Sequence, residues 1–211
     1  MIPAFGKYMT MLYSIFLKPE KFSIYWKRFV DEVIQLGLKS LFIVILMSGF
    51  MGAVLVIQTA SVIESAWIPD YTVGFTVKQS MLLEFCPTII SLILAGKVGS
   101  NIASELGTMR VTEQIDALEV MGVNSIGYLI GPKILASLFI FPVVIMYSMV
   151  FGFLGGGIVC YATEIIPVEQ YIEGIRSFSE DNFGYVRYAL IKTSVFAFLI
   201  TSISSFFGYF L

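Results

Sequence analysis

Two long stretches of the chain carry no charged residue. Residues 40–63 are uncharged over 24 positions, and residues 134–163 are uncharged over 30. An α-helix rises 1.5 Å per residue, so about 20 apolar residues are enough to cross the roughly 30 Å hydrocarbon core of a bilayer. We therefore predict that each stretch forms a membrane-spanning helix, the second of them kinked at Pro142.

Two further apolar stretches are interrupted by single charges. Residues 79–96 contain Glu84, and residues 188–211 contain Lys192 close to their beginning. The chain of 211 residues is 57% hydrophobic and 13% charged, whereas ordinary soluble domains are about 25% charged. The sequence thus predicts one all-α integral membrane domain over residues 1–211, with four recognisable transmembrane helices.

The stretch that precedes the first predicted span is amphipathic. Its apolar positions recur at spacings of four and three, at Phe22, Trp26, Phe29, Val33 and Leu36. An apolar face with aromatic anchors beside Lys and Arg is typical of a helix that lies in the membrane interface. We expect such a helix within an interfacial segment of residues 1–38; a soluble helix packed against a partner protein is the alternative. No small-residue cleavage site follows the apolar residues 8–17, so we expect no removable signal peptide.

Residues 97–123 are the only long polar and charged segment between two strongly apolar stretches. Their apolar residues keep helical spacing but change phase between Gly107 and Arg110, which predicts two helices rather than one. The second is expected to be a short amphipathic helix of about ten residues, within a connecting loop of residues 97–131.

The expected ends of this short helix follow from its residue types. Thr112 is suited to cap its N-terminus, and Glu113 and Asp116 lie near the positive end of the helix dipole. Gly122 is placed to end it, because glycine readily adopts the left-handed conformation of a C-cap.

Two other segments connect the predicted spans. Residues 64–78 predict a short loop with Trp67 and Tyr71 at the level of the membrane interface. Residues 164–187 are acidic and amphipathic. We expect them to lie outside the membrane, with a helix around residues 168–178.

The distribution of Lys and Arg predicts the orientation of the chain, because cytoplasmic loops carry an excess of basic residues. Six precede the first span and three flank or occupy the loop of residues 97–131, against three on the opposite side. The N-terminus and that loop are therefore expected in the cytoplasm. The residues counted are Lys7, Lys18, Lys21, Lys27, Arg28 and Lys39, then Lys97, Arg110 and Lys133, and on the opposite side Lys78, Arg176 and Arg187.

Glu84 and Pro87 need an explanation, because both are costly inside a membrane helix. A carboxylate at the centre of a span costs about 2.5–3.5 kcal/mol on insertion scales, so it usually faces a cavity or a partner group. Pro87 frees a backbone carbonyl about one turn earlier, near Leu83 and Glu84, where a kink would suit a widened cavity. We interpret Glu84 as functional; the alternative is that it lies near the outer interface and pairs with Lys78 without a further role.

Several kinds of site are disfavoured by the composition. The chain has no histidine, which removes the usual general base and the usual zinc and haem ligand. Its formal net charge of -2 makes nucleic acid an unsuitable partner. Cys86 and Cys160 both fall in apolar stretches and are expected to be small buried residues without a redox role.

The fragment AGKVGS at residues 95–100 has some similarity to a phosphate-binding loop. However, Ser91 stands where that motif requires Gly, and Val98 follows the Lys in place of Ser or Thr. It is not a P-loop. We therefore expect no enzyme activity, no metal and no cofactor bound by this chain, and any use of ATP would come from a partner.

The central segment closely resembles the signature of one protein family. The run GKVGSNIASELGTMRVTEQIDALEVMGVNSIGYLIGPKILA is similar to that of the permease subunit of MCE-linked phospholipid ABC transporters, the MlaE/YrbE family. Glu84 and Pro87 resemble the E-L-G-P element of the family, and Gln58 resembles its L-Q motif near the end of the first span. Residues 192–196 resemble its K-S-x-V-F segment, so the resemblance covers most of the chain.

This resemblance implies a role in lipid transport. The family forms a homodimeric permease in the bacterial inner membrane, with a cytoplasmic ABC ATPase that binds ATP and Mg and a periplasmic MCE-domain protein. It implies that phospholipid enters a cavity near Gln58, Glu84 and Pro87 and moves between the inner and outer membranes. It also implies that a cytoplasmic coupling helix binds the ATPase, through Glu105, Arg110, Thr112, Glu113, Gln114, Asp116 and Glu119.

The sequence departs from the family pattern at three places. Leu83 and Cys86 stand where the family often has Arg and Gly beside its Glu, which removes one expected ion-pair partner. Asn124 and Ser125 replace a common Asp-Pro pair, and both pairs favour a turn. Beyond Leu211 the family pattern continues with a Gly-rich loop and a fifth span.

Two other functions remain open from the residues alone. The chain could be a non-transporting scaffold that anchors a cytoplasmic partner through residues 97–131, in which case Glu84 would have no role. It could also be an ion-coupled secondary carrier that uses Glu84, although the sequence shows no evident inverted repeat of broken helices.

Overall fold

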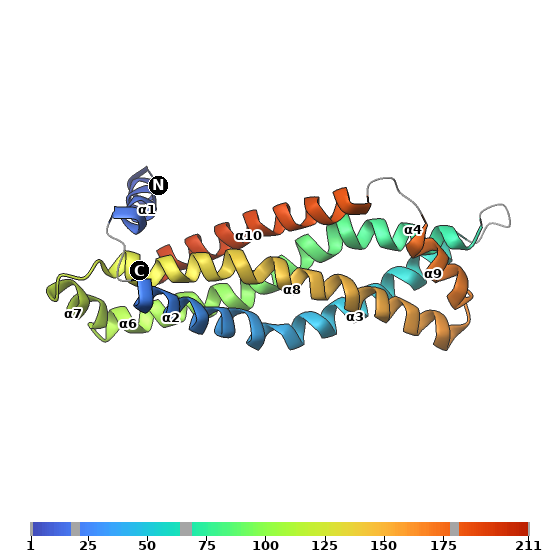
Figure 1. Ribbon diagram of the computed structural model, residues 1–211, viewed down its shortest axis with the longest axis horizontal. Coiled ribbons are helices and arrows are strands. Elements are labelled where there is room, and N and C mark those ends of the chain that lie inside the picture. Colours follow the sequence, from blue (N-terminus) through green and yellow to red (C-terminus); the bar gives the residue numbers. More distant parts are fainter. Residues whose placement is uncertain (1, 18–21, 64–68, 178–181, 211) are drawn as a thin grey trace. The chain divides into compact units, whose positions relative to one another are not determined.

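The computed structural model describes residues 2–17, 22–63, 69–177 and 182–210, and within these ranges the chain is helical with no strand (Figure 1). Four of its continuous helices are long and apolar enough to cross a membrane. The predicted all-α membrane fold with four spans is therefore confirmed. These helices are Tyr25–Val62, Tyr71–Val111, Ser125–Thr163 and Phe183–Phe210.

The N-terminal part consists of α1 (Ile2–Leu17), α2 (Phe22–Val33), the π-helical stretch η1 (Ile34–Leu38) and α3 (Lys39–Val62). The amphipathic α2 continues through η1 into α3 without a break, so the expected interfacial helix and the first span form one helix. Gly37 lies in the middle of this junction. A Cβ atom there would lie 2.2 Å from the Ile140 side chain, so the absence of a side chain permits close packing against α8.

The second long helix begins earlier than predicted. It comprises α4 (Tyr71–Ser80), the π-helical stretch η2 (Met81–Ile90), α5 (Ser91–Leu94), a second π-helical stretch η3 (Ala95–Gly99) and α6 (Ser100–Val111). Tyr71, expected in a loop, is its first residue, and Trp67 lies outside the described residues. Pro87 lies within η2, where the wider turn accommodates a residue that has no N–H to donate.

The predicted pair of helices in the central segment is present, but the break is not at Gly107 to Arg110. Helix α6 continues through those residues, and α7 (Gln114–Val120) begins after Glu113, whose φ of 58° turns the chain. The expected capping role of Thr112 is also wrong. Its hydroxyl donates to the Thr108 carbonyl and so closes the end of α6.

The predicted end of the short helix is confirmed at Gly122, whose φ is 78°. The N–H of Gly122 donates to the Glu119 carbonyl, and the N–H of Val123 donates to the Leu118 carbonyl at 3.1 Å. This pair of bonds is the Schellman motif, which satisfies carbonyls that the end of a helix leaves without partners.

The remaining elements are α8 (Ser125–Thr163), α9 (Val168–Arg176) and α10 (Asn182–Phe210). Helix α8 begins well before the predicted span at residue 134, because its backbone hydrogen bonds continue beyond the uncharged stretch. Helix α9 confirms the helix expected around residues 168–178. Cys86 and Cys160 are both buried and free, as expected.

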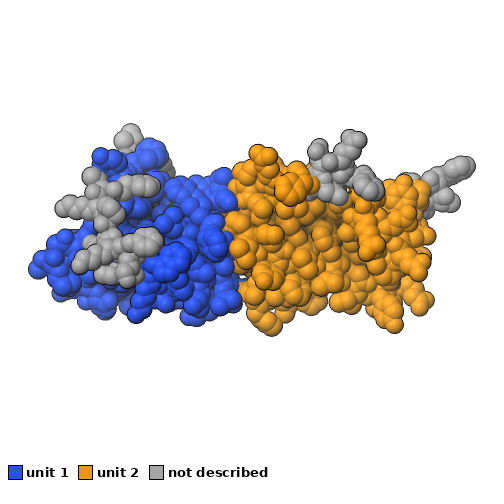
Figure 2. Space-filling model, in the orientation of Figure 1, with its two compact units in different colours: residues 1–40, 94–141, 194–211 blue, residues 41–93, 142–193 orange. Residues whose placement is uncertain are grey.

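The chain divides into two compact units (Figure 2). Unit 1 comprises residues 1–40, 94–141 and 194–211, and unit 2 comprises residues 41–93 and 142–193. In unit 1, the apolar core includes fully buried side chains from α6, α7 and α8, among them Ile102, Leu106, Ile115, Ile130 and Phe141.

In unit 2, glycines bring helix backbones into direct contact. A Cβ atom on Gly52 of α3 would lie 1.9 Å from the carbonyl oxygen of Gly152 in α8. Likewise, a Cβ atom on Gly155 of α8 would lie 2.1 Å from the carbonyl oxygen of Gly49 in α3. Such distances are far below van der Waals contact, so only glycine fits. These glycines therefore allow α3 and α8 to pack with their backbones in contact.

Candidate functional site

Unit 2 contains an ion pair between η2 and α10. The Nζ of Lys192 donates to Oε2 of Glu84 at 2.9 Å and also to the backbone carbonyl of Leu83 at 3.2 Å. The Thr88 hydroxyl donates to the same carboxylate at 3.4 Å. One ammonium group thus binds both a side chain and the backbone of η2.

The contact with Leu83 follows from the position of Pro87. Proline has no N–H, so Pro87 cannot make the α-helical bond to the carbonyl four residues earlier, which is that of Leu83. Lys192 supplies a donor in its place. The carbonyl of Leu83, expected from the position of Pro87 to lack an α-helical donor, accepts this bond.

The alternative pairing of Glu84 with Lys78 is wrong. Lys78 is 4% exposed, and its Nζ donates to the Ser177 carbonyl at 3.1 Å. Lys192 is the partner of Glu84, although it lies 108 residues further along the chain. The Glu84 side chain is 65% exposed and that of Lys192 is 20% exposed, so the paired charges remain accessible from one side.

The other two residues expected at this site, Gln58 and Pro87, differ from each other in their exposure. Gln58 is exposed on α3, whereas Pro87 is buried in η2. The structure thus links Glu84 to Lys192 and to the backbone beside Pro87. A cavity shared by Gln58, Glu84 and Pro87 stays a prediction.

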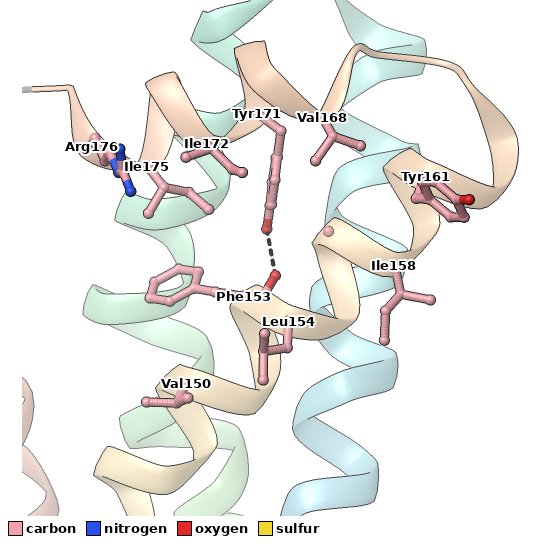
Figure 3. A pocket seen from close by; sticks show the side chains of 11 residues that line it. Val150, Phe153, Leu154, Ile158, Tyr161, Val168, Tyr171, Ile172, Ile175 and Arg176 are labelled. Atoms are coloured by element: carbon pink, nitrogen blue, oxygen red, sulfur yellow. Dashed lines mark hydrogen bonds between the residues drawn. The ribbon is translucent and has the colours of Figure 1, made fainter.

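An apolar groove lies between α8 and α9 in the same unit (Figure 3). It has a volume of about 560 Å³, and its described lining is mostly apolar and includes Arg176. The Tyr171 side chain reaches from α9 to α8, where its hydroxyl donates to the Phe153 carbonyl at 3.2 Å. Burial raises the pKa of Tyr171, so this hydroxyl stays protonated and remains a donor.

Sequence reasoning missed this groove, although a signal for it exists. Val168, Ile172 and Ile175 recur at spacings of four and three in an otherwise polar segment, which places them on one face of α9. All three line the groove.

The second candidate site is the turn from α6 to α7 in unit 1. Arg110 and Asp116 form an ion pair of 2.6 Å across this turn, with side chains 45% and 51% exposed. Exposed pairs of this kind contribute about 0–1 kcal/mol to stability, so the pair shapes the turn more than it stabilises the fold.

Three large apolar side chains are exposed around the same turn. Val111, Val120 and Met121 are 84%, 88% and 68% exposed. We call the exposed residues of this turn the 110–121 surface. They are Arg110, Val111, Thr112, Glu113, Gln114, Asp116, Ala117, Glu119, Val120 and Met121.

Two of the residues expected at this site also form contacts inward. Glu119 accepts hydrogen bonds from the Ser125 hydroxyl at 2.9 Å and the Tyr209 hydroxyl at 2.8 Å, which joins α7 to α8 and α10. Glu105 pairs with Lys133 of α8 at 2.8 Å. Glu119 thus anchors the 110–121 surface to α8 and α10, and Glu105 links α6 to α8.

The fold and these sites define a multi-pass membrane protein with an accessible ion pair between two of its long apolar helices and an exposed turn after one of these two helices. A family model described as Permease MlaE matches residues 29–211, and the chain belongs to this family of permeases. The resemblance seen in the sequence is confirmed.

Similar proteins carry permease names. The chain is 33% identical to a "Probable ABC transporter permease protein" of Rickettsia bellii, over 89% of this chain and 71% of the relative. It is 28% identical to "Intermembrane phospholipid transport system permease protein MlaE" of Haemophilus influenzae, over 98% of this chain and 78% of the relative. It is 29% identical to "Protein TRIGALACTOSYLDIACYLGLYCEROL 1, chloroplastic" of Arabidopsis thaliana, over 92% of this chain and 55% of that protein.

Proposed function

We propose that this chain is the permease subunit of an ATP-driven phospholipid transporter that moves lipid between the inner and outer membranes of a bacterium. The ion pair of Glu84 and Lys192 beside Pro87 is the observation that carries this proposal. Membership of the MlaE permease family and the name of the Haemophilus influenzae relative support it.

The chemistry of unit 2 suits a phospholipid. A lipid head group carries a phosphate and often an ammonium, and the exposed pair of Glu84 and Lys192 offers one charge of each sign. Acyl chains require apolar surface, which the groove between α8 and α9 supplies. Charged side chains in a span are costly unless they are paired, so a pair that keeps most of Glu84 exposed is suited to binding a polar group.

The 110–121 surface suits a partner protein on the cytoplasmic side. We propose that a separate ABC ATPase binds it, hydrolyses ATP and shifts the permease between two conformations. Its exposed apolar residues offer area for an interface, and Glu119 connects them to α8 and α10. A second copy of this chain and a periplasmic MCE-domain protein complete the proposed assembly in the inner membrane, with the N-terminus in the cytoplasm.

The test is ATP-dependent lipid transfer from vesicles that contain the full transporter assembly. We expect Glu84→Gln to reduce the initial rate at least about tenfold, because Lys192 is then left without an opposite charge. Glu173→Gln is the matched control, since Glu173 is an exposed glutamate on α9. Co-purification of the ATPase should be unchanged in both variants.

Two results would contradict the proposal. A non-transporting scaffold predicts equal behaviour of Glu84→Gln and the control, with no ATP-dependent transfer by either protein. An ion-coupled carrier predicts flux that follows an ion gradient in vesicles that lack the ATPase.

A further inference from the structure

A polar cleft lies in unit 1, between the η1–α3 junction and the η3–α6 junction. Its volume is about 430 Å³. Seven of its nine lining residues have polar or charged side chains, and two of those are lysines. The lining residues are Gln35, Leu36, Lys39, Ser40, Lys97, Val98, Ser100, Asn101 and Ser104.

The cleft contains the residues of the AGKVGS fragment that do not form a P-loop. Lys97, Val98 and Ser100 come from this fragment, and Asn101 follows it. The Nζ of Lys97 donates to the backbone carbonyl of Lys39. This bond holds the Lys97 side chain against the other lysine-bearing helix and leaves two further ammonium protons for a ligand.

None of the described residues that line the cleft is a carboxylate. The acidic residues nearest in sequence to its two walls are Glu32 and Glu105, and both pair with Lys133. Among the residues that the structure describes, no ion pair involves Lys39 or Lys97. The cleft thus combines two positive charges with hydroxyl and amide donors, which is the set of groups that binds a phosphate.

The position of the two lysines in the sequence indicates their depth. Lys39 directly precedes the uncharged residues 40–63, and Lys97 directly follows the apolar residues 79–96. Both therefore mark the ends of spans on the side that the basic residues assign to the cytoplasm. Basic pockets between spans at this level are suited to lipid head groups.

We infer that this cleft binds a phosphate group through Lys39 and Lys97, with Asn101 and Ser104 as further hydrogen-bond donors. The phosphate comes either from a phospholipid of the cytoplasmic leaflet or from a soluble phosphate compound. The site is separate in sequence and chemistry from Glu84 and does not depend on the transport proposal, so a chain that transports no lipid would still bind phosphate here.

The test uses the purified full chain and two probes. Native mass spectrometry gives the apparent Kd for phosphatidylglycerol, with diacylglycerol as the probe that lacks phosphate. Thermal unfolding in inorganic phosphate, against chloride at equal ionic strength, tests the soluble source. We expect Lys39→Gln with Lys97→Gln to weaken phosphate-dependent binding at least about tenfold.

The matched control is Lys7→Gln with Lys27→Gln, which removes the same charge from exposed positions outside the cleft. Binding lost only in the cleft variant supports the site. Preference for phosphatidylglycerol then identifies a lipid, and stabilisation by inorganic phosphate alone identifies a soluble ligand. Equal loss in both variants, or no phosphate-dependent binding by the natural chain, overturns the inference.

A second pair of variants serves if removal of Lys97 disturbs folding through its bond to Lys39. Asn101→Asp places a carboxylate in the cleft and keeps both lysines. We expect it to weaken binding about tenfold, while Gln114→Glu, which makes the same amide-to-carboxylate change at an exposed position outside the cleft, retains binding. Unchanged binding by Asn101→Asp overturns the inference.

Discussion

The Nζ of Lys133 lies 2.8 Å from a carboxylate oxygen of Glu105, and the side chain of Lys133 is only 1% exposed. The same Nζ lies 2.5 Å from a carboxylate oxygen of Glu32. The three residues come from α8, α6 and α2. One buried cation therefore joins the helix that leads to the 110–121 surface to the amphipathic N-terminal helix.

Replacement of Lys133 by Met should strongly destabilise the protein. Glu32 and Glu105 would lose their shared cation, and Glu32, with a side chain 12% exposed, would be left buried and unpaired. Removal of one partner from a buried ion pair costs about 3–5 kcal/mol. The measurement is the free energy of unfolding in detergent, with Lys27→Met on the exposed side of α2 as the control. Equal stability of the two variants would show that the cluster does not hold the helices together.

Replacement of Gly52 by Ala should prevent normal packing of α3 against α8. The added Cβ would lie 1.9 Å from the Gly152 carbonyl oxygen, which belongs to backbone and cannot rotate away. Gly96→Ala is the control, because no atom lies within 4 Å of a Cβ at that position. Thermal unfolding should show a large loss of stability for Gly52→Ala and a neutral or slightly stabilising effect for Gly96→Ala. A normal unfolding temperature for Gly52→Ala would mean that the two helices separate at little cost.

The helices of this fold were predictable because a bilayer requires about 20 apolar residues in succession, and that requirement is visible in a single sequence. The residues at which these helices begin and end were not predictable in the same way. Tyr71 and Ser125 begin helices in segments polar enough to resemble loops, since helical hydrogen bonds continue beyond the apolar stretch. The break after Thr112 depends on the positive φ of Glu113, a conformation uncommon for Glu, whereas Gly107 misleadingly suggested a break.

The partners of charged residues were equally hard to predict. Lys78 lies nearer to Glu84 in sequence than Lys192 does, yet the packing of α10 beside η2 determines the pair. Spacing along one helix indicates which side chains share a face, but it carries no information about which distant helix lies opposite. An effect of Pro87 on a carbonyl about one turn earlier was predictable, because that effect is local.

Exchange of the charges at Glu84 and Lys192 should restore function only in part. Glu84→Lys with Lys192→Glu recreates an ion pair, but a glutamate at position 192 cannot donate to the Leu83 carbonyl. We therefore expect Lys192→Met, which removes the donor to Leu83 as well as the ion pair, to impair lipid transfer more than Glu84→Gln, and the exchanged protein to lie between Glu84→Gln and the natural chain. The measurement is the initial transfer rate at equal protein abundance. Full recovery in the exchanged protein would show that the bond to Leu83 has no functional role.

Reversal of two charges on the 110–121 surface should separate the permease from its ATPase. Glu113→Lys with Asp116→Lys changes the charge of this surface by four units without altering a buried residue, since both side chains are exposed. The variant also removes the ion pair with Arg110, so Arg110→Ala serves to measure that effect alone. Glu169→Lys with Glu173→Lys makes the same charge change on α9 and is the matched control. We expect the first variant to lose most ATPase co-purification and lipid transfer, Arg110→Ala to lose part of both, and the α9 control to retain most of both. If all three retain both, the ATPase binds elsewhere on the chain.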